Sequence, residues 1–160
     1  MRAALLIACL FLASPSLADC SQQAQVGLGF MNRYLAYLEE IFERRSEQSV
    51  ADWLAADAQV APEFVEAYRR LEAEGYAQDS ELGWGVDLLL DAQDYPDQGF
   101  QFASCSGEPG VVILRGVDWP QFEVAVRVGS PAQGSQVLGA GRVNLPEHAR
   151  ASRSAPAAGE

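Results

Sequence analysis

The chain has 160 residues and a formal net charge of −11, with no lysine among its basic residues. A strongly acidic protein is repelled by phosphate groups, so the composition argues against nucleic acid and anionic lipid surfaces as partners. Without lysine, Schiff-base chemistry and a lysine nucleophile are excluded. The length is that of one domain with enough residues for a hydrophobic core.

Residues 1–18 have the features of a secretory signal peptide. Arg2 supplies a positive charge, residues 3–13 form an apolar run, and Ser16 and Ala18 are small residues at the positions that a signal peptidase reads. We expect cleavage after Ala18 and a periplasmic location for the mature chain. No later run is long and apolar enough to span a bilayer, so no transmembrane segment is predicted.

Two cysteines remain after this cleavage, Cys20 and Cys105. An even number of cysteines in an exported chain predicts a disulfide, with two unpaired thiols as the alternative. The disulfide would stabilise the fold by about 4 kcal/mol in the chain-entropy treatment. A lipoprotein signal requires a small residue directly before its cysteine, and Asp19 stands there instead. A lipid anchor is therefore not favoured.

Three helices are predicted in the first half of the chain. Residues 22–45 should form a long helix, because its apolar residues recur at spacings of three and four. Ser49, followed by Asp52 three positions later, predicts the capped start of a short second helix. Pro62 predicts the start of a third helix, and Gly75 is the expected C-terminal stop.

After Gly75 the apolar period changes from 3.6 to 2, which is typical of strands. The predicted strands are residues 100–105, 111–117, 122–128 and 135–143. Short turns between them predict an antiparallel meander, and helices followed by strands are the α+β pattern. We therefore expect three N-terminal helices packed on a curved antiparallel sheet of about four strands, in a single domain covering residues 19–143. Residues 144–160 have no periodicity and are predicted to be a disordered tail.

The linker before the first strand reads DLLLDAQDY at residues 87–95. An aspartate, an apolar run, then Ala-Gln-Asp and an aromatic residue resembles the YbjP/YqhG-type bacterial envelope family, a domain of unknown function. The Tyr-Leu pairs at 34–35 and 37–38 match its N-terminal helix. The resemblance covers about residues 22–143, implies a cone-shaped, nuclear-transport-factor-2-like fold, and lends no catalytic residue.

One interpretation of this linker is structural. Its Asp and Gln side chains would cap backbone groups at a helix-to-strand corner, while residues 88–90 anchor the corner in the core. Gln93 and Asp94 would point inward, with Arg115 or Arg127 as a partner.

A second interpretation is a small-ligand site at the mouth of a cone pocket. Its candidate residues are Asp87, Asp91, Gln93, Asp94 and Tyr95. An enzyme would use Asp91 or Asp94 as general base, with Tyr95 as proton donor. A third is an irregular calcium site, although the EF-hand spacing counted from Asp91 fails at its fifth and sixth positions.

Other chemistry has little support in the sequence. His148, the sole histidine, lies in the predicted tail, and there is no zinc-ligand cluster, phosphate loop or Gly-x-Ser-x-Gly motif. Residues 27–30, GLGF, are expected to serve close packing instead of nucleotide binding. We assign no catalytic residue, metal or cofactor.

The function that these observations favour is a non-enzymatic periplasmic binding or accessory protein of the bacterial cell envelope, with an envelope protein or a small ligand as its partner. One alternative is a ligand-binding or enzymatic cone pocket that uses Asp91, Asp94 and Tyr95. Another is a protein inhibitor, such as an immunity protein to a secreted toxin. An exposed apolar or acidic patch would favour a protein partner, and a deep pocket with inward carboxylates would favour a ligand.

Overall fold

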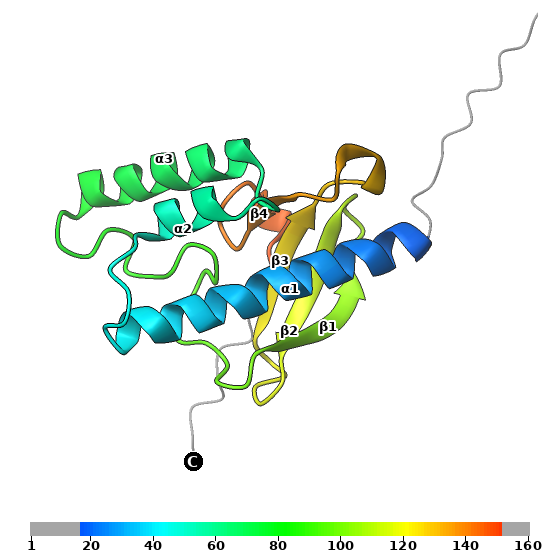
Figure 1. The fold of residues 1–160 in the computed structure, drawn as a ribbon, viewed down its shortest axis with the longest axis horizontal. Coiled ribbons are helices and arrows are strands. Elements are labelled where there is room, and N and C mark those ends of the chain that lie inside the picture. Colours follow the sequence, from blue (N-terminus) through cyan, green and yellow to red (C-terminus); the bar gives the residue numbers. More distant parts are fainter. Residues whose placement is uncertain (1–16, 152–160) are drawn as a thin grey trace, which may run out of the picture.

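The computed structural model describes residues 17–151, and these form a four-stranded antiparallel sheet with three helices (Figure 1). The predicted α+β class is confirmed. Residues 1–16, which hold most of the predicted signal peptide, and residues 152–160 lie outside the described part. None of the described helices combines the length and the apolar character needed to cross a membrane.

Helix α1 (Leu17–Phe42) lies across the sheet and supplies the largest part of the helical core (Figure 1). Phe30, Met31 and Tyr34 are fully buried, as the predicted stripe requires. Gly27 brings the helix close to strands β2 and β3, because a Cβ there would lie 3.0 Å from Cγ2 of Val112. The expectation of close packing for GLGF is confirmed at this glycine.

Helices α2 (Val50–Ala56) and α3 (Pro62–Gln78) pack on each other, and α3 also contacts β4. The predicted cap is present, since the Ser49 hydroxyl accepts a hydrogen bond from the Asp52 amide at 3.1 Å. The prediction that Gly75 ends the third helix is wrong. Helix α3 continues to Gln78, and Gly75 is buried where a Cβ would collide with the indole of Trp84.

The sheet has the strand order β1-β2-β3-β4, each pair antiparallel, so the predicted meander is confirmed. Its strands are β1 (Phe100–Cys105), β2 (Val111–Gly116), β3 (Glu123–Val128) and β4 (Val137–Ala140). Register irregularities occur between Phe102 and Ser104 and between Arg127 and Val128. Such bulges increase the local twist and bend of a sheet.

Part of the outer face of the sheet is covered by a segment that the sequence assigned to the tail. Leu145 lies shortly before the 3-10 helix η2 (Glu147–Ala149), and Ala149 is the last residue of that helix. Both are buried against Val111 and Ala125. Ala125 is consequently 1% exposed although the alternation of β3 places it on the outer face. The folded chain therefore continues beyond the predicted boundary at residue 143.

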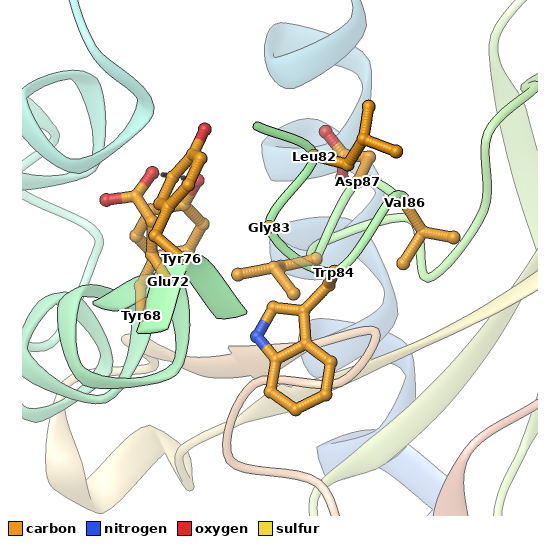
Figure 2. A pocket seen from close by; sticks show the side chains of 9 residues that line it. Tyr68, Glu72, Tyr76, Leu82, Gly83, Trp84, Val86 and Asp87 are labelled. Atoms are coloured by element: carbon orange, nitrogen blue, oxygen red, sulfur yellow. Dashed lines mark hydrogen bonds between the residues drawn. The ribbon is translucent and has the colours of Figure 1, made fainter. Parts of the chain in front are cut away.

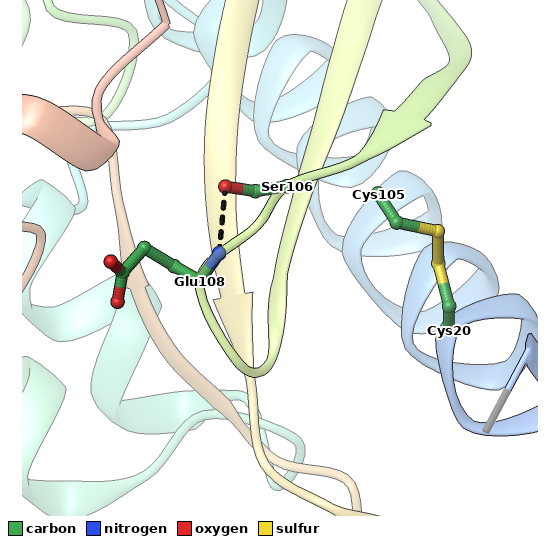
Figure 3. The surroundings of a disulfide bond; sticks show 4 residues. All are labelled: Cys20, Cys105, Ser106 and Glu108. Carbon is green, nitrogen blue, oxygen red and sulfur yellow. Dashed lines mark hydrogen bonds between the residues drawn. A yellow bond between two sulfur atoms is a disulfide. The ribbon is translucent and has the colours of Figure 1, made fainter. Parts of the chain in front are cut away.

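A disulfide joins Cys20, near the start of α1, to Cys105, the last residue of β1, as predicted (Figure 3). Their Cα atoms are 6.3 Å apart. At the adjacent turn, the Ser106 hydroxyl accepts a hydrogen bond from the Glu108 amide at 3.2 Å. The long helix is thus tied covalently to an edge strand of the sheet.

Candidate functional site

Asp87 organises the linker between α3 and β1. Its Oδ1 accepts hydrogen bonds from the amides of Leu89 and Leu90, both at 2.8 Å, and its Oδ2 accepts one from the Tyr34 hydroxyl. Residues 88–90 are buried in the core. A carboxylate that accepts backbone amides two and three residues ahead is the side-chain cap expected of an Asx turn. The structural interpretation of the linker is confirmed for Asp87.

Asp91 forms an ion pair with Arg142, which lies two residues after the end of β4. The Arg142 amide also donates a hydrogen bond to the Leu88 carbonyl at 2.9 Å, so this residue holds the linker by both backbone and side chain. The prediction of Arg115 or Arg127 as the partner of the linker is wrong. Arg115 is exposed, and Arg127 donates instead to the Asn144 carbonyl at 3.4 Å.

Of the three remaining candidates, Gln93 and Asp94 are exposed, and Tyr95 is partly buried against the core. Gln93 is exposed and donates to the Gly85 carbonyl at 2.8 Å, which closes the linker on itself. Asp94 is exposed, so the expectation that it is an inward hydrogen-bonding group is wrong. The Tyr95 ring stacks on Phe42, with centroids 6.4 Å apart. The five candidate residues therefore serve different contacts, and of them only Asp87 lines the hollow described below.

Two buried phenols near Asp87 are held in their neutral form. Burial, and then the charge of Asp87, raises the pKa of Tyr34 well above its usual value. Burial, and then the charge of Glu72, raises the pKa of Tyr68, whose hydroxyl donates to Glu72 Oε1 at 3.2 Å. At neutral pH these groups are hydrogen-bond donors that stabilise carboxylates, because the ionised phenolate is disfavoured by desolvation and by like charge.

A small hollow of about 90 Å³ lies between α3 and residues 82–88 (Figure 2). Helix α3 contributes Tyr68, Glu72 and Tyr76 to it, and the linker contributes Trp84 and Asp87. Ligand pockets for metabolites usually measure roughly 300–1,000 Å³. This hollow therefore has room for a group of a few heavy atoms, not for a whole metabolite.

The walls of the hollow are fixed by local contacts. Trp84 Nε1 donates a hydrogen bond to the Leu71 carbonyl at 2.5 Å, and the indole packs on Gly75. Asp79 Oδ1 accepts from the amides of Glu81 and Leu82, both at 2.9 Å, and these hydrogen bonds lower the pKa of Asp79. These hydrogen bonds stabilise the turn that carries Leu82.

Sequence reasoning missed this hollow. From the sequence, neither Tyr68 nor Trp84 is assigned a role at a site. The signal was the spacing of Tyr68, Glu72 and Tyr76, which lie four residues apart and therefore share one face of a helix. Nothing in the sequence placed Trp84 against that face, because the contact depends on the path of the linker.

A second, wider hollow of about 460 Å³ lies where the start of α3 meets β3 and β4. Its charged side chains are those of Glu63 and Arg127, and Arg127 donates a hydrogen bond to the Asn144 carbonyl. Asn144 donates to the Leu138 carbonyl at 3.0 Å, so its amide serves the local backbone. Gln136 is the other uncharged polar side chain that lines this hollow.

Between residues 17 and 151, no group of three or more His, Cys, Asp or Glu residues is placed to hold a metal ion. His148 lies at the surface, 3.2 Å from Glu108, and both cysteines of this region form the disulfide. Comparison of the chain with family models, curated proteins and solved structures found no match to any of them.

Proposed function

We propose that this protein is a non-enzymatic binding module of the bacterial cell envelope and that its partner is another protein. The observation that carries the proposal is that two of the linker carboxylates, Asp87 and Asp91, are held by contacts within the fold. Asp87 accepts hydrogen bonds from Tyr34 and two backbone amides, and Asp91 is paired with Arg142. A carboxylate held in this way supports the corner of the fold and is poorly placed to act as a general base.

The surface beside the linker supports a protein partner. Tyr76, at the end of α3, is 54% exposed, and Leu82, in the following turn, is 71% exposed. Both line the small hollow. The exposed acids Asp79 and Glu81 lie between them in the sequence. Aromatic and apolar side chains surrounded by polar ones are typical of the centre of an interface, because they bury apolar area at little entropic cost.

The proposed location is the periplasm, reached through the signal peptide at residues 1–18. The disulfide between Cys20 and Cys105 supports an oxidising compartment, because structural disulfides persist there and are rare in the cytosol. The test is N-terminal sequencing of protein released from the periplasm by osmotic shock. We expect Asp19 as the first residue, and recovery of the uncleaved chain from the cytosol alone would contradict the proposal.

We further propose that the helices and the sheet form a nuclear-transport-factor-2-like cone and that the chain is a relative of the YbjP/YqhG-type envelope proteins. The DLLLDAQDY segment and an antiparallel meander crossed by a long helix support this. The test is a crystal structure of a member of that family. We expect the sheet order β1-β2-β3-β4 and a capped linker aspartate, and a different strand order would contradict the relationship.

Photo-crosslinking in living cells tests the protein-binding function. A photoreactive amino acid replaces Leu82 in one strain and Arg115, an exposed residue of β2, in a control strain. We expect a discrete protein adduct from position 82 that mass spectrometry identifies and that position 115 does not give. The same adducts from both positions, or none from position 82 together with a small molecule that co-purifies with the protein, would contradict the proposal.

A further inference from the structure

We propose that the hollow between α3 and residues 82–88 receives one cationic side chain, an arginine or a lysine, of the partner protein. This inference rests on the proposed function, since it names the chemistry of the partner at the same surface. It is carried by three properties of the hollow, namely its charge, its aromatic walls and its size.

The hollow has negative charge on two sides. Glu72 comes from α3 and Asp87 from the linker, and both are partly buried (Figure 2). Glu72 accepts a hydrogen bond from Tyr68, and within residues 17–151 no arginine or histidine forms an ion pair with it. A partly buried carboxylate attracts a cation more strongly than a fully solvated one, because water screens it less.

Aromatic rings form much of the remaining wall. Tyr68 and Tyr76 come from α3, and Trp84 comes from the linker (Figure 2). A cation within about 6 Å of such a ring is attracted by the ring quadrupole. Trp84 also has a cation contact outside the hollow, since the guanidinium of Arg142, which does not line the hollow, lies 5.8 Å from the centroid of its ring.

The size and rim of the hollow fit the end of a side chain. A volume of about 90 Å³ holds a guanidinium or ammonium group but not a metabolite. Leu82 and Tyr76 stand exposed at the rim, where they can contact the aliphatic stem of a bound arginine or lysine. The overall charge of −11 also steers a basic partner toward this protein.

The test uses two peptide pairs as probes against the mature chain. Gly-Gly-Arg-Gly-Gly is compared with the same peptide carrying citrulline, which keeps the shape of arginine and removes the charge, and the lysine peptide is compared with its acetyl-lysine form. The readout is the indole N–H signal of Trp84 in nuclear magnetic resonance spectra, assigned with Trp84→Phe. We expect a saturable shift with at least one charged peptide and none with the neutral ones.

Two variants connect this shift to the hollow. Glu72→Gln should weaken peptide binding by about tenfold, the loss that corresponds to about 1.4 kcal/mol. Glu66→Gln, a matched change at an exposed position of the same helix, should leave it within about twofold. If Glu72→Gln does not fold, Tyr76→Ala at the exposed rim replaces it, with an expected severalfold loss. Equal binding of charged and neutral peptides, or equal effects of both glutamine variants, would overturn the inference.

The outcomes separate this inference from the function on which it rests. A protein adduct from position 82 that is unaffected by Glu72→Gln would remove the cation subsite and leave the protein-binding function in place. Peptide binding that depends on Glu72, without any protein adduct in cells, would leave the subsite in place and count against the protein partner.

Discussion

The hydroxyl of Tyr34, in the C-terminal half of α1, donates a hydrogen bond to the carboxylate of Asp87, 53 residues further along the chain. Tyr34 is fully buried, and Asp87 also accepts from two amides of the buried leucine segment. This contact joins the helical layer to the linker that leads into the sheet. It also satisfies polar groups that would otherwise be costly to bury, because an unpaired buried donor loses its hydration without compensation.

Asp87→Ala should therefore lower the free energy of unfolding by about 2–3 kcal/mol, the range expected when a charged hydrogen-bond acceptor is removed and its buried donors are left unpaired. Urea denaturation followed by circular dichroism measures this. Asp94→Ala is the matched control, since Asp94 belongs to the same linker and is exposed. It should change stability by no more than about 0.5 kcal/mol. Equal losses in both variants would contradict the assigned role of Asp87.

The stability should decrease at alkaline pH. Burial raises the pKa of Tyr34 and of Tyr68, so in the folded state both phenols keep their protons above the ordinary value of about 10. In the unfolded chain the two phenols lose their protons near the ordinary pKa. Because only the unfolded state then loses protons, rising pH favours unfolding. The contribution is fully present below about pH 10 and decreases above it. Urea midpoints measured from about pH 8 to about pH 11 should decrease, and less steeply in Tyr34→Phe. A constant midpoint in the wild type would contradict this.

Gly75→Ala should destabilise the protein although alanine is the better helix former. A Cβ at this position collides with Trp84, and the hydrogen bond of Trp84 to the Leu71 carbonyl restricts the indole from moving away. Overpacking of this kind costs about 1–3 kcal/mol. Gly29→Ala in α1 is the control, because its Cβ would meet only the end of the Arg33 side chain, at 3.4 Å. It should be neutral or stabilising by up to about 1 kcal/mol. Thermal unfolding measures both, and a stabilised Gly75→Ala would be incompatible with the packing described.

Replacing both Cys20 and Cys105 by serine should lower the free energy of unfolding by up to about 4 kcal/mol, because the disulfide closes a loop over 85 residues. The same loss should follow when the wild-type protein is treated with a thiol reductant. The reductant should have no effect on the double variant. Unchanged stability of the reduced wild type would show that the crosslink does not constrain the unfolded chain.

Local signals were sufficient to predict most of the fold from the sequence. Strand β1 has the predicted bounds, because alternation and flanking turns define it on their own. The same holds for the Ser49 cap, whose partner Asp52 is three residues away. Gly75 illustrates the opposite case. A glycine near the end of a helical pattern predicts a stop, and only the position of Trp84 reveals that it serves close packing.

The candidate site was less predictable, since its contacts join distant segments. The linker was recognised as a corner of the fold, but the inward carboxylate is Asp87 and not Asp94. The sequence did not reveal Arg142 as the partner of Asp91, because the ion pair depends on the path of the chain after β4. Composition likewise predicted a disordered tail after residue 143. Leu145 is buried because it packs on side chains of the folded sheet, and this contact has no local signal in the sequence.

The segment that packs on the outer side of the sheet has a practical consequence. A shortened chain that stopped at Val143 would lose Leu145 and Ala149 and would leave Val111 and Ala125 facing water on adjacent strands. Neighbouring apolar side chains on a bare sheet are prone to self-association. Expression fragments should therefore retain the chain at least through Arg150, and trimming by proteases in that stretch should increase self-association.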